Sequence, residues 1–177
     1  MSDTRTTIGI DPSLTGTGIV VLQNGEIVEQ ILIKSKPNGS RPKDELLRLT
    51  TIVDNVKEIV DKHKPKLILV EGLAFMAKST SLMQLAGLNY LLRLSFADIP
   101  FVVVTPSSLK KFVSGAGNAK KDLMLMATYK RYGVEFSDDN LADGYGLAQV
   151  GHALLDIHTL PLTKEQKEVI LLLSTQL

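Results

Sequence analysis

Cysteine is absent from this sequence, and so is any apolar run long enough to cross a membrane. Without cysteine, the chain can form no disulfide bond and no zinc site with cysteine ligands. A membrane-spanning helix needs roughly 18 or more consecutive apolar residues, and residues 1–7 lack the apolar segment of a signal peptide. We therefore expect a soluble intracellular protein without a membrane partner, either cytoplasmic or within an organelle.

A strong excess of charge of either sign is also lacking. The 177 residues include 20 basic and 19 acidic side chains, and the net charge of +1 by itself favours no class of partner. The segment 105–135 differs, because basic residues outnumber acidic ones there. Such a patch can bind phosphate groups even in a near-neutral protein, and a solvated surface is the alternative. Its basic residues are Lys110, Lys111, Lys120, Lys121, Lys130 and Arg131.

Low-complexity segments are missing as well, which argues against long disordered regions. Hydrophobic residues make up 44% of the chain, enough for one globular domain over residues 1–177. Within it, we expect residues 1–6 to form a loose polar tail and residues 163–177 to contain a C-terminal helix.

Apolar periodicity predicts strands and helices in mixed order. Asn24-Gly25 lies between two apolar runs and predicts a tight hairpin. The strands expected are 7–11, 17–22, 26–34, 66–71 and 100–104, and the helices 44–63, 79–96, 106–113, 120–132, 139–157 and 163–174. Three antiparallel strands followed by parallel strands with connecting helices are the order of the ribonuclease H-like fold. This α/β fold has a mixed five-stranded sheet flanked by helices.

Two of the expected strands end in a carboxylate. Asp11 is the last residue of the first strand, and Glu71 is the last residue of the fourth. If these strands are parallel neighbours, about 4.8 Å apart, the two side chains emerge side by side at one edge of the sheet. Ligands bind at that edge in open α/β sheets.

A third acidic group lies at the start of the helix expected over 139–157. Asp139 and Asp143 are four residues apart and share a helix face. Asp138 and Asp139 also suit the N-terminus of that helix, and this is the account we favour for Asp138. Asp143 lies among apolar and small residues, where an unpaired buried charge is costly. A cation or a basic partner would offset that cost.

Carboxylates that converge on one point repel each other unless a cation lies between them. Oxygen-only sites of this kind suit Mg²⁺ or Mn²⁺. Two such ions promote in-line displacement at a phosphodiester. The carboxylates therefore predict a two-Mg²⁺ hydrolase, with Mn²⁺ able to substitute. As a hypothesis for its mechanism, the 3′ oxygen of the scissile phosphodiester leaves, which gives a 5′ phosphate and a 3′ hydroxyl.

Four segments together resemble RuvC-type Holliday junction resolvases: GIDPSLTGTG, LILVEGLAFMAKS, TPSSLKKFVSGAGNAKKD and ADGYGLA. The resemblance implies a homodimeric, Mg²⁺-dependent endonuclease of DNA recombination and repair. Such an enzyme makes paired nicks across a four-way DNA junction. Asp11, Glu71 and Asp143 match the metal-binding acids of that family. The residues identify no helicase partner.

The resemblance also implies DNA contacts. Phe75, in FMAK, matches an aromatic residue that lies against unstacked bases, although a core phenylalanine is the alternative. Lys110 and Lys121 match lysines that contact phosphates. We extend the expected DNA-binding set to their neighbours and to the lysine of FMAK, namely Lys78, Lys111 and Lys120.

The sequence departs from the family pattern at three points. The position of a fourth ligand offers Asp139 or Asn140, of which we favour Asp139 and keep Asn140 as a neutral alternative. The spacing from Glu71 to Phe75 is one residue longer than usual. Two glycines, Gly144 and Gly146, stand where better helix formers are usual and cost about 1 kcal/mol each relative to Ala, for which close packing on the sheet would be a reason.

The helix expected over 79–96 is apolar enough to pair with its symmetry mate in a dimer, or simply to cover the sheet. Three alternatives to a resolvase are open. They are a nuclease of the same fold with broader branched-DNA or RNA/DNA-hybrid targets, a non-catalytic junction-binding protein, and an actin-like ATPase module. The last is the weakest, because the chain has only one segment like a phosphate loop.

Overall fold

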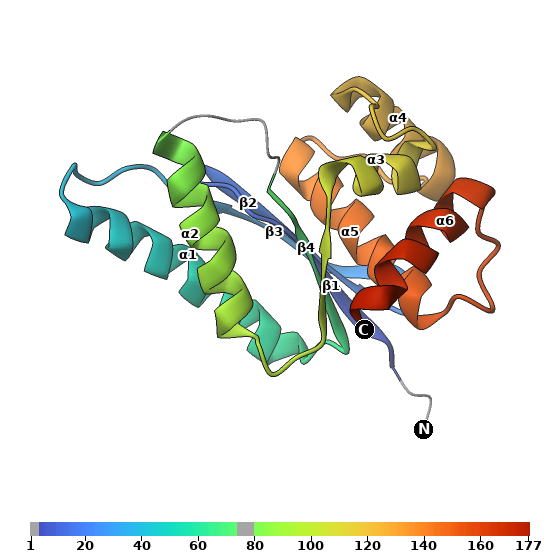
Figure 1. Ribbon diagram of the computed structural model, residues 1–177, viewed down its shortest axis with the longest axis horizontal. Helices are drawn as coiled ribbons and strands as arrows, with labels where there is room; N and C mark the ends of the chain where they lie inside the picture. Colours follow the sequence, from blue (N-terminus) through green and yellow to red (C-terminus); the bar gives the residue numbers. More distant parts are fainter. Residues whose placement is uncertain (1–3, 74–79) are drawn as a thin grey trace.

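The computed structural model describes residues 4–73 and 80–177 and contains a mixed sheet between two layers of helices (Figure 1). The strands are β1 (Thr6–Asp11), β2 (Gly16–Gln23), β3 (Glu26–Lys34), β4 (Leu67–Glu71) and β5 (Phe101–Val104). The helices are α1 (Pro42–His63), α2 (Thr80–Ser95), α3 (Pro106–Ser114), α4 (Lys121–Tyr132), α5 (Asp139–Leu155) and α6 (Lys164–Leu173), followed by the short 3-10 helix η1 (Ser174–Gln176).

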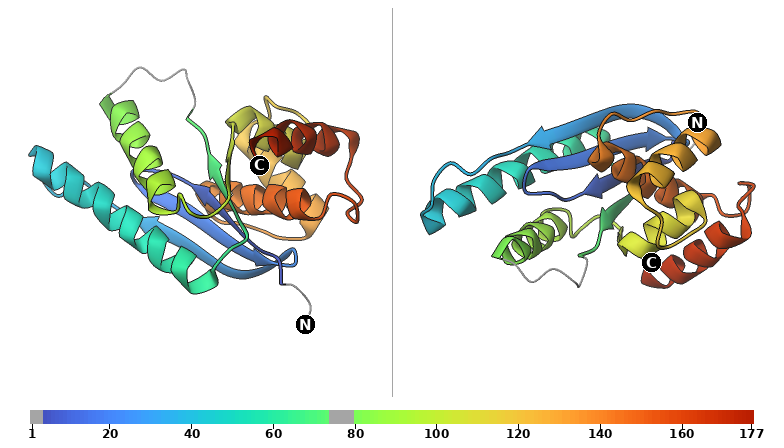
Figure 2. Two further views of the ribbon diagram at one scale, coloured as in Figure 1. Left: turned by 60° about the horizontal axis from the view of Figure 1, so that its bottom comes forward. Right: turned by 90° about the horizontal axis from the view of Figure 1, so that it is seen from above.

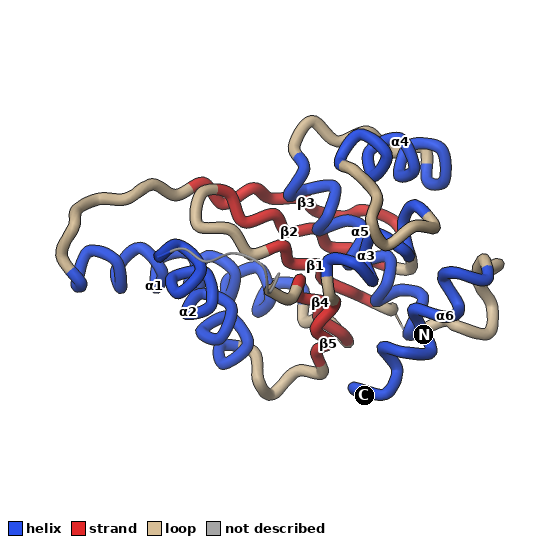
Figure 3. Tube along the Cα trace, turned by 45° about the horizontal axis from the view of Figure 1, so that its top comes forward, coloured by secondary structure: helices blue, strands red, loops and turns tan. Residues whose placement is uncertain are grey.

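The five strands lie in the order β3-β2-β1-β4-β5, as Figure 3 shows. The pairs β1–β2 and β2–β3 are antiparallel, whereas β1–β4 and β4–β5 are parallel. This confirms that the first and fourth strands are parallel neighbours. The predicted hairpin is also present, with positive φ angles at Asn24 (50°) and Gly25 (89°), as a tight two-residue turn requires.

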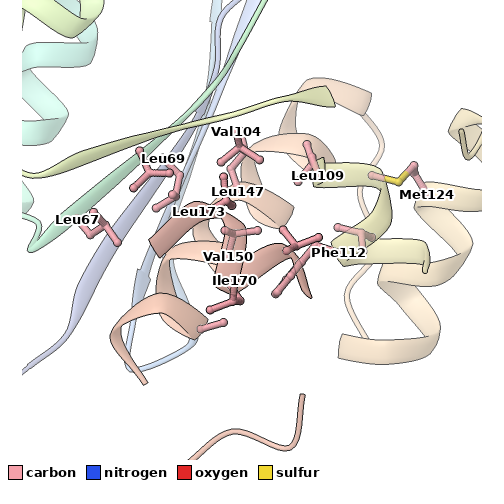
Figure 4. Packing of buried hydrophobic residues seen from close by; sticks show 14 of the residues in the cluster. Leu67, Leu69, Val104, Leu109, Phe112, Met124, Leu147, Val150, Ile170 and Leu173 are labelled. Carbon is pink, nitrogen blue, oxygen red and sulfur yellow. The ribbon is translucent and has the colours of Figure 1, made fainter. Parts of the chain in front are cut away.

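Each face of the sheet is covered by its own set of helices (Figure 2). Side chains alternate along a strand, so Ile8 and Ile10 of β1 pack into the cluster formed with α1 and α2. The opposite face packs against α3, α5 and α6, where Leu69 of β4 meets Leu147 and Val150 of α5 (Figure 4). By this alternation, the last residues of β1 and β4 belong to the face that α5 covers.

α5 lies unusually close to the sheet because glycines meet at the contact. A Cβ atom placed on Gly9 of β1 would lie 2.0 Å from the Gly144 carbonyl oxygen. A Cβ on Gly18 of β2 would lie 2.1 Å from the Asn140 carbonyl oxygen. Close packing of Gly144 on the sheet is thus confirmed. Gly18 likewise makes room for α5.

Most boundaries differ from those expected by one or two residues, and two of these differences have a clear physical reason. β1 begins at Thr6, one residue earlier than expected, because the Thr6 side chain is buried with the strand. α1 begins at Pro42, not at residue 44, because Asp44 accepts hydrogen bonds from both the backbone and the guanidinium group of Arg41 at the helix start. No helix within the described ranges is long and apolar enough to cross a membrane.

Candidate active site

The two strand-end carboxylates lie together, as the parallel pairing requires. The β1–β4 register runs from Thr7–Leu67 to Ile10–Val70, so Asp11 and Glu71 are the next residues on adjacent strands. Asp11 is buried, and the neighbouring Glu71 carboxyl group raises its pKa. The edge of the sheet therefore carries two adjacent carboxyl groups.

α5 brings a third carboxyl group to this pair. Asp143 lies on the first turns of α5, whose close approach to the glycines of β1 and β2 sets its position. Asp11, Glu71, Asp143 and Asn140 all line one open cleft of about 660 Å³. Residues from three elements distant in the sequence thus border the same space.

The pKa values of these carboxyl groups are raised. Burial, followed by the neighbouring Glu71, raises the pKa of Asp11 to about 9. Burial also raises the pKa of Glu71 to about 7 and that of Asp143 to about 6, although Lys110 opposes both shifts. The protein alone therefore does not hold three adjacent negative charges near neutral pH; a bound cation would.

The chemistry of the donors fits a hard divalent cation. The groups that line the cleft beside one another are carboxylate and amide oxygens, with no sulfur or imidazole among them. Within the described part of the chain, no three acidic or imidazole side chains are already gathered closely enough to enclose an ion. Metal binding would therefore favour the deprotonated carboxylates and draw them closer together.

A second hollow of about 220 Å³ also borders these carboxylates, and we call it the basic hollow after its two lysines, although acidic residues line it as well. Glu71 and Asp143 border it together with Lys110, Lys121 and Asp139. The Lys121 ammonium lies 2.6 Å from a carboxylate oxygen of Asp139. Of the two residues considered for a fourth ligand, Asn140 therefore lines the cleft, whereas Asp139 faces the hollow and pairs with a lysine.

The other residues expected to bind DNA fall into three groups. Lys111 forms an ion pair with Glu168 of α6, at 2.6 Å, and so joins two helices. Lys120 is exposed immediately before α4. Phe75 and Lys78 lie outside the described residues. The structure thus places Lys110 and Lys121 beside the carboxylates and engages Lys111 elsewhere.

Sequence reasoning missed two polar residues near the site. Arg48 of α1 lines the cleft and donates hydrogen bonds to the Leu14 carbonyl and, at 3.0 Å, to the Ser35 hydroxyl. It thereby holds the turn that follows Asp11. A usable signal was present, because Arg48 lies four residues before the buried Ile52 and so interrupts the apolar stripe of α1.

The second missed residue is Asn89 of α2. Its side-chain amide donates a hydrogen bond of 2.9 Å to the main-chain carbonyl of Glu71. Asn89 lies four residues after Leu85 and three before Leu92, both of which belong to the apolar stripe expected for this helix. A polar residue on such a stripe is the available sign that its partner lies inside the protein.

Comparison with known proteins identifies relatives. A family model described as crossover junction endodeoxyribonuclease RuvC matches residues 7–132. Two proteins of that name from strains of Prochlorococcus marinus are 31% and 28% identical over 153 and 152 residues. Each match covers 81% of this chain and 96% of the relative. The family match includes Asp11 and Glu71 and ends before α5.

The solved structure of Thermus thermophilus RuvC in complex with a Holliday junction substrate is similar in fold. The TM-score is 0.70 at 17% sequence identity, over 88% of this chain and 97% of that one. This match confirms the predicted fold, with three antiparallel strands followed by two parallel ones.

Proposed function

The chain belongs to the crossover junction endodeoxyribonuclease RuvC family, and we propose that it cuts four-way DNA junctions at the cleft bordered by Asp11, Glu71 and Asp143. The observation that carries this proposal is the set of three carboxyl groups with raised pKa values in one open cleft. A purely structural set of acids would be paired with bases, as Asp44 is with Arg41.

In this proposal, Asp11, Glu71 and Asp143 hold divalent cations. Two Mg²⁺ ions, or Mn²⁺ in their place, would supply Lewis acidity at the scissile phosphodiester. Asp11 is central, because it lies between Glu71 on the adjacent strand and the helix that carries Asp143. In this proposal the 3′ oxygen leaves, so that hydrolysis would give a 5′ phosphate and a 3′ hydroxyl.

Asn140 and Asp139 have different roles in this proposal. Asn140 lines the cleft and offers a neutral oxygen beside Asp143. Asp139 holds Lys121 in the basic hollow until a DNA phosphate competes for that lysine. The positions of the two side chains thus favour Asn140 as the residue that completes the metal site, although the sequence favoured Asp139.

DNA would approach the carboxylates from the side of the basic hollow. Lys110 and Lys121 line it, and the exposed Lys120 extends the positive surface to the start of α4. Phosphate contacts of this kind position a duplex without reading its sequence. Selectivity for a junction would then depend on how two such sites are spaced.

We place the dimer contact on the outer face of α2. Met83, Tyr90 and Leu94 lie on this helix at spacings of seven and four residues, and they are 78%, 68% and 74% exposed. The inner face packs on the sheet through Leu88 and Leu92. The helix therefore covers the sheet and also presents an apolar stripe, which suits a two-fold partner of the same chain.

The test is cleavage of an end-labelled synthetic four-way junction beside a linear duplex and a Y-fork, with Mg²⁺, Mn²⁺ or EDTA. We expect paired, symmetric nicks in the junction alone, and only with a divalent cation. Equal cutting of the fork would favour a nuclease with broader branched-DNA targets. Tight binding without cutting under either metal would instead favour a non-catalytic junction-binding protein.

A further inference from the structure

α2 carries a buried amide at the point where β4 ends. Asn89 is 1% exposed, and it lies between Leu88 and Leu92, which pack into the apolar cluster on that face of the sheet. Its Nδ2 atom donates to the carbonyl oxygen of Glu71 at 2.9 Å. Burial of a polar side chain this deep in the core is costly unless the side chain makes hydrogen bonds inside the protein.

At Glu71 the strand register continues toward β5 but has already ended toward β1. Toward β5, Glu71 pairs with Val104, and the amide of Gly72 donates to the Val104 carbonyl at 2.8 Å. Toward β1, the register ends one residue earlier, at Ile10–Val70. The Asn89 amide thus supplies a donor to the Glu71 carbonyl where the β1–β4 ladder has stopped.

Asn89 keeps this bond at the expense of its other polar atom. Within the part of the chain that the structure describes, Oδ1 of Asn89 is buried without a hydrogen-bond partner. An apolar residue of similar size would avoid that orphaned acceptor and would suit the surrounding leucines. The amide therefore contributes something other than core packing, and the bond that it makes leads to the end of β4.

We propose that Asn89 is a positioning residue that sets where the Glu71 carboxylate lies in the metal site. The direction of a side chain follows the orientation of its own peptide units, so a tilt at the Glu71 carbonyl moves its carboxylate relative to Asp11. Small displacements of this kind are enough to weaken a site that depends on geometry. The inference rests on the proposed function of the cleft.

The same bond links the outer face of α2 to the site. Tyr90, on the exposed stripe with Met83 and Leu94, directly follows Asn89 in the chain. A shift of α2 caused by a partner on that stripe would reach Glu71 through the Asn89 amide. Positioning by Asn89 is therefore also a route by which assembly of two chains would bear on the cleft.

The test compares Asn89→Leu with a matched variant at the other end of the sheet, Gln149→Leu. Gln149 is also buried, 8% exposed, and its side-chain amide donates to the carbonyl of Gly25, in the turn between β2 and β3, at 3.2 Å and to the Tyr145 hydroxyl at 2.8 Å. Each variant loses one amide-to-carbonyl bond, and Gln149→Leu also loses the bond to Tyr145, so the control is at least as disruptive. Only Asn89→Leu loses a bond at the carboxylates, so a difference between the variants reports position and not lost stability.

Three measurements on the full-length protein separate a positioning role of Asn89 from a purely structural one. They are Mn²⁺ affinity of the metal-free protein by titration calorimetry, junction affinity in EDTA, and the Mg²⁺ dependence of single-turnover cleavage. We expect Asn89→Leu to weaken Mn²⁺ binding about 10-fold, in the range seen for groups that orient metal ligands. We expect junction affinity in EDTA to stay within twofold, and Gln149→Leu to match wild type in all three.

Two results would overturn the positioning role. One is wild-type Mn²⁺ affinity and cleavage in Asn89→Leu. The other is an equal loss in both variants that follows their folded fraction in thermal unfolding. If Asn89→Leu does not fold, Asn89→Ser replaces it, with the same expectations. If the wild-type chain neither binds Mn²⁺ nor cuts junctions, the proposed function itself fails and the inference fails with it.

Discussion

The acidic residues near the two ends of α5 lie in opposite environments, and their pKa values shift in opposite directions. At the end that begins with Asp139, the carboxyl group of Asp143 is buried and its pKa is raised to about 6. At the other end, Asp156 accepts a hydrogen bond from the Thr159 hydroxyl and pairs with Arg5, and these contacts lower its pKa. One helix therefore carries an acid in a costly environment and an acid in a favourable one.

The difference separates function from stability along a single helix. Gln149 and Asp156 connect the later part of α5 to the Gly25 turn and to Arg5, next to β1, with their hydrogen bonds made inside the protein. Asp143 and Asn140 border the open cleft, where a ligand from outside the protein can reach them. Perturbed acids beside a cleft are typical of functional sites, so substitutions at the two ends should have separable effects.

The largest effect is expected from Asp143→Asn. Cleavage should fall by at least about 100-fold, because this substitution removes a carboxylate from the metal site. Binding of the junction should remain or become tighter, since the change removes a negative charge. Quantitative cleavage assays and gel-shift titrations measure the two effects.

The matched control for this substitution is Asp156→Asn at the far end of α5. It removes an equivalent charge outside the cleft and should leave cleavage within about twofold of wild type. Comparable turnover in both variants would remove Asp143 from the site.

The second effect is a dependence of stability on pH in the metal-free protein. Folding raises the pKa of Asp11 from 3.8 to about 9, so the native state binds more protons than the unfolded state between these values. The free energy of unfolding should therefore fall as pH rises from about 5 to 9, by a few kcal/mol as an order of magnitude. Urea unfolding in EDTA across this range measures it.

Asp11→Asn sharpens this second test. The variant should lose most of the decline, because its side chain does not titrate. Asp156→Asn should keep the decline, because the lowered pKa of Asp156 affects stability only in acid, below this range. If the free energy of unfolding of the wild-type protein is constant from pH 5 to 9, Asp11 is not buried in its protonated, uncharged form.

A third, smaller effect distinguishes the two residues at the start of α5. Asn140→Ala should slow cleavage about 10-fold with junction binding unchanged, since it removes an oxygen from the cleft. Asp139→Asn should change cleavage less and should strengthen junction binding, because it releases Lys121 from its ion pair. Single-turnover rates at several Mn²⁺ concentrations measure both. The reverse order would return Asp139 to the position of fourth ligand.

The smallest effect is expected at the basic hollow. Lys121→Ala should weaken junction binding severalfold and reduce the slope of log affinity against log salt concentration by about 1. Lys62→Ala is the matched control, because Lys62 is also paired with an acid, Glu29, at 2.8 Å, on an exposed part of the molecule. An unchanged slope for Lys121→Ala, equal to that of the control, would argue against a phosphate contact.

Much of this architecture could be predicted from local pattern. Apolar runs and the Asn24-Gly25 turn predicted the hairpin, and the helices on either side of β4 favoured parallel pairing for it. That β1 is its parallel neighbour was only a condition of the prediction, which the structure meets. With that pairing, Asp11 and Glu71 had to meet, because a strand register places residues that end neighbouring strands side by side. The prediction of Asp143 depended on its helix being apolar, and the structure places Asp143 at the cleft.

Contacts between distant segments could not be predicted in this way. The periodicity of α2 marks Asn89 as inward-facing but does not say that its partner is the carbonyl of Glu71, 18 residues earlier. Likewise, the spacing of Asp139 and Asp143 places both on one helix face. It does not predict that Asp139 forms an ion pair with Lys121 while Asn140 lines the cleft.

By itself, then, the sequence determined the strands, the helices, the family and the acids at the strand ends, because periodicity and turn chemistry act over a few residues. Only the tertiary structure decided how α5 meets the sheet. That contact depends on Gly9 and Gly18 approaching residues more than 100 positions away, where any Cβ atom would collide with the backbone of α5. The depth of α5 against β1 and β2 sets which side chains reach the cleft, and packing of whole elements sets that depth.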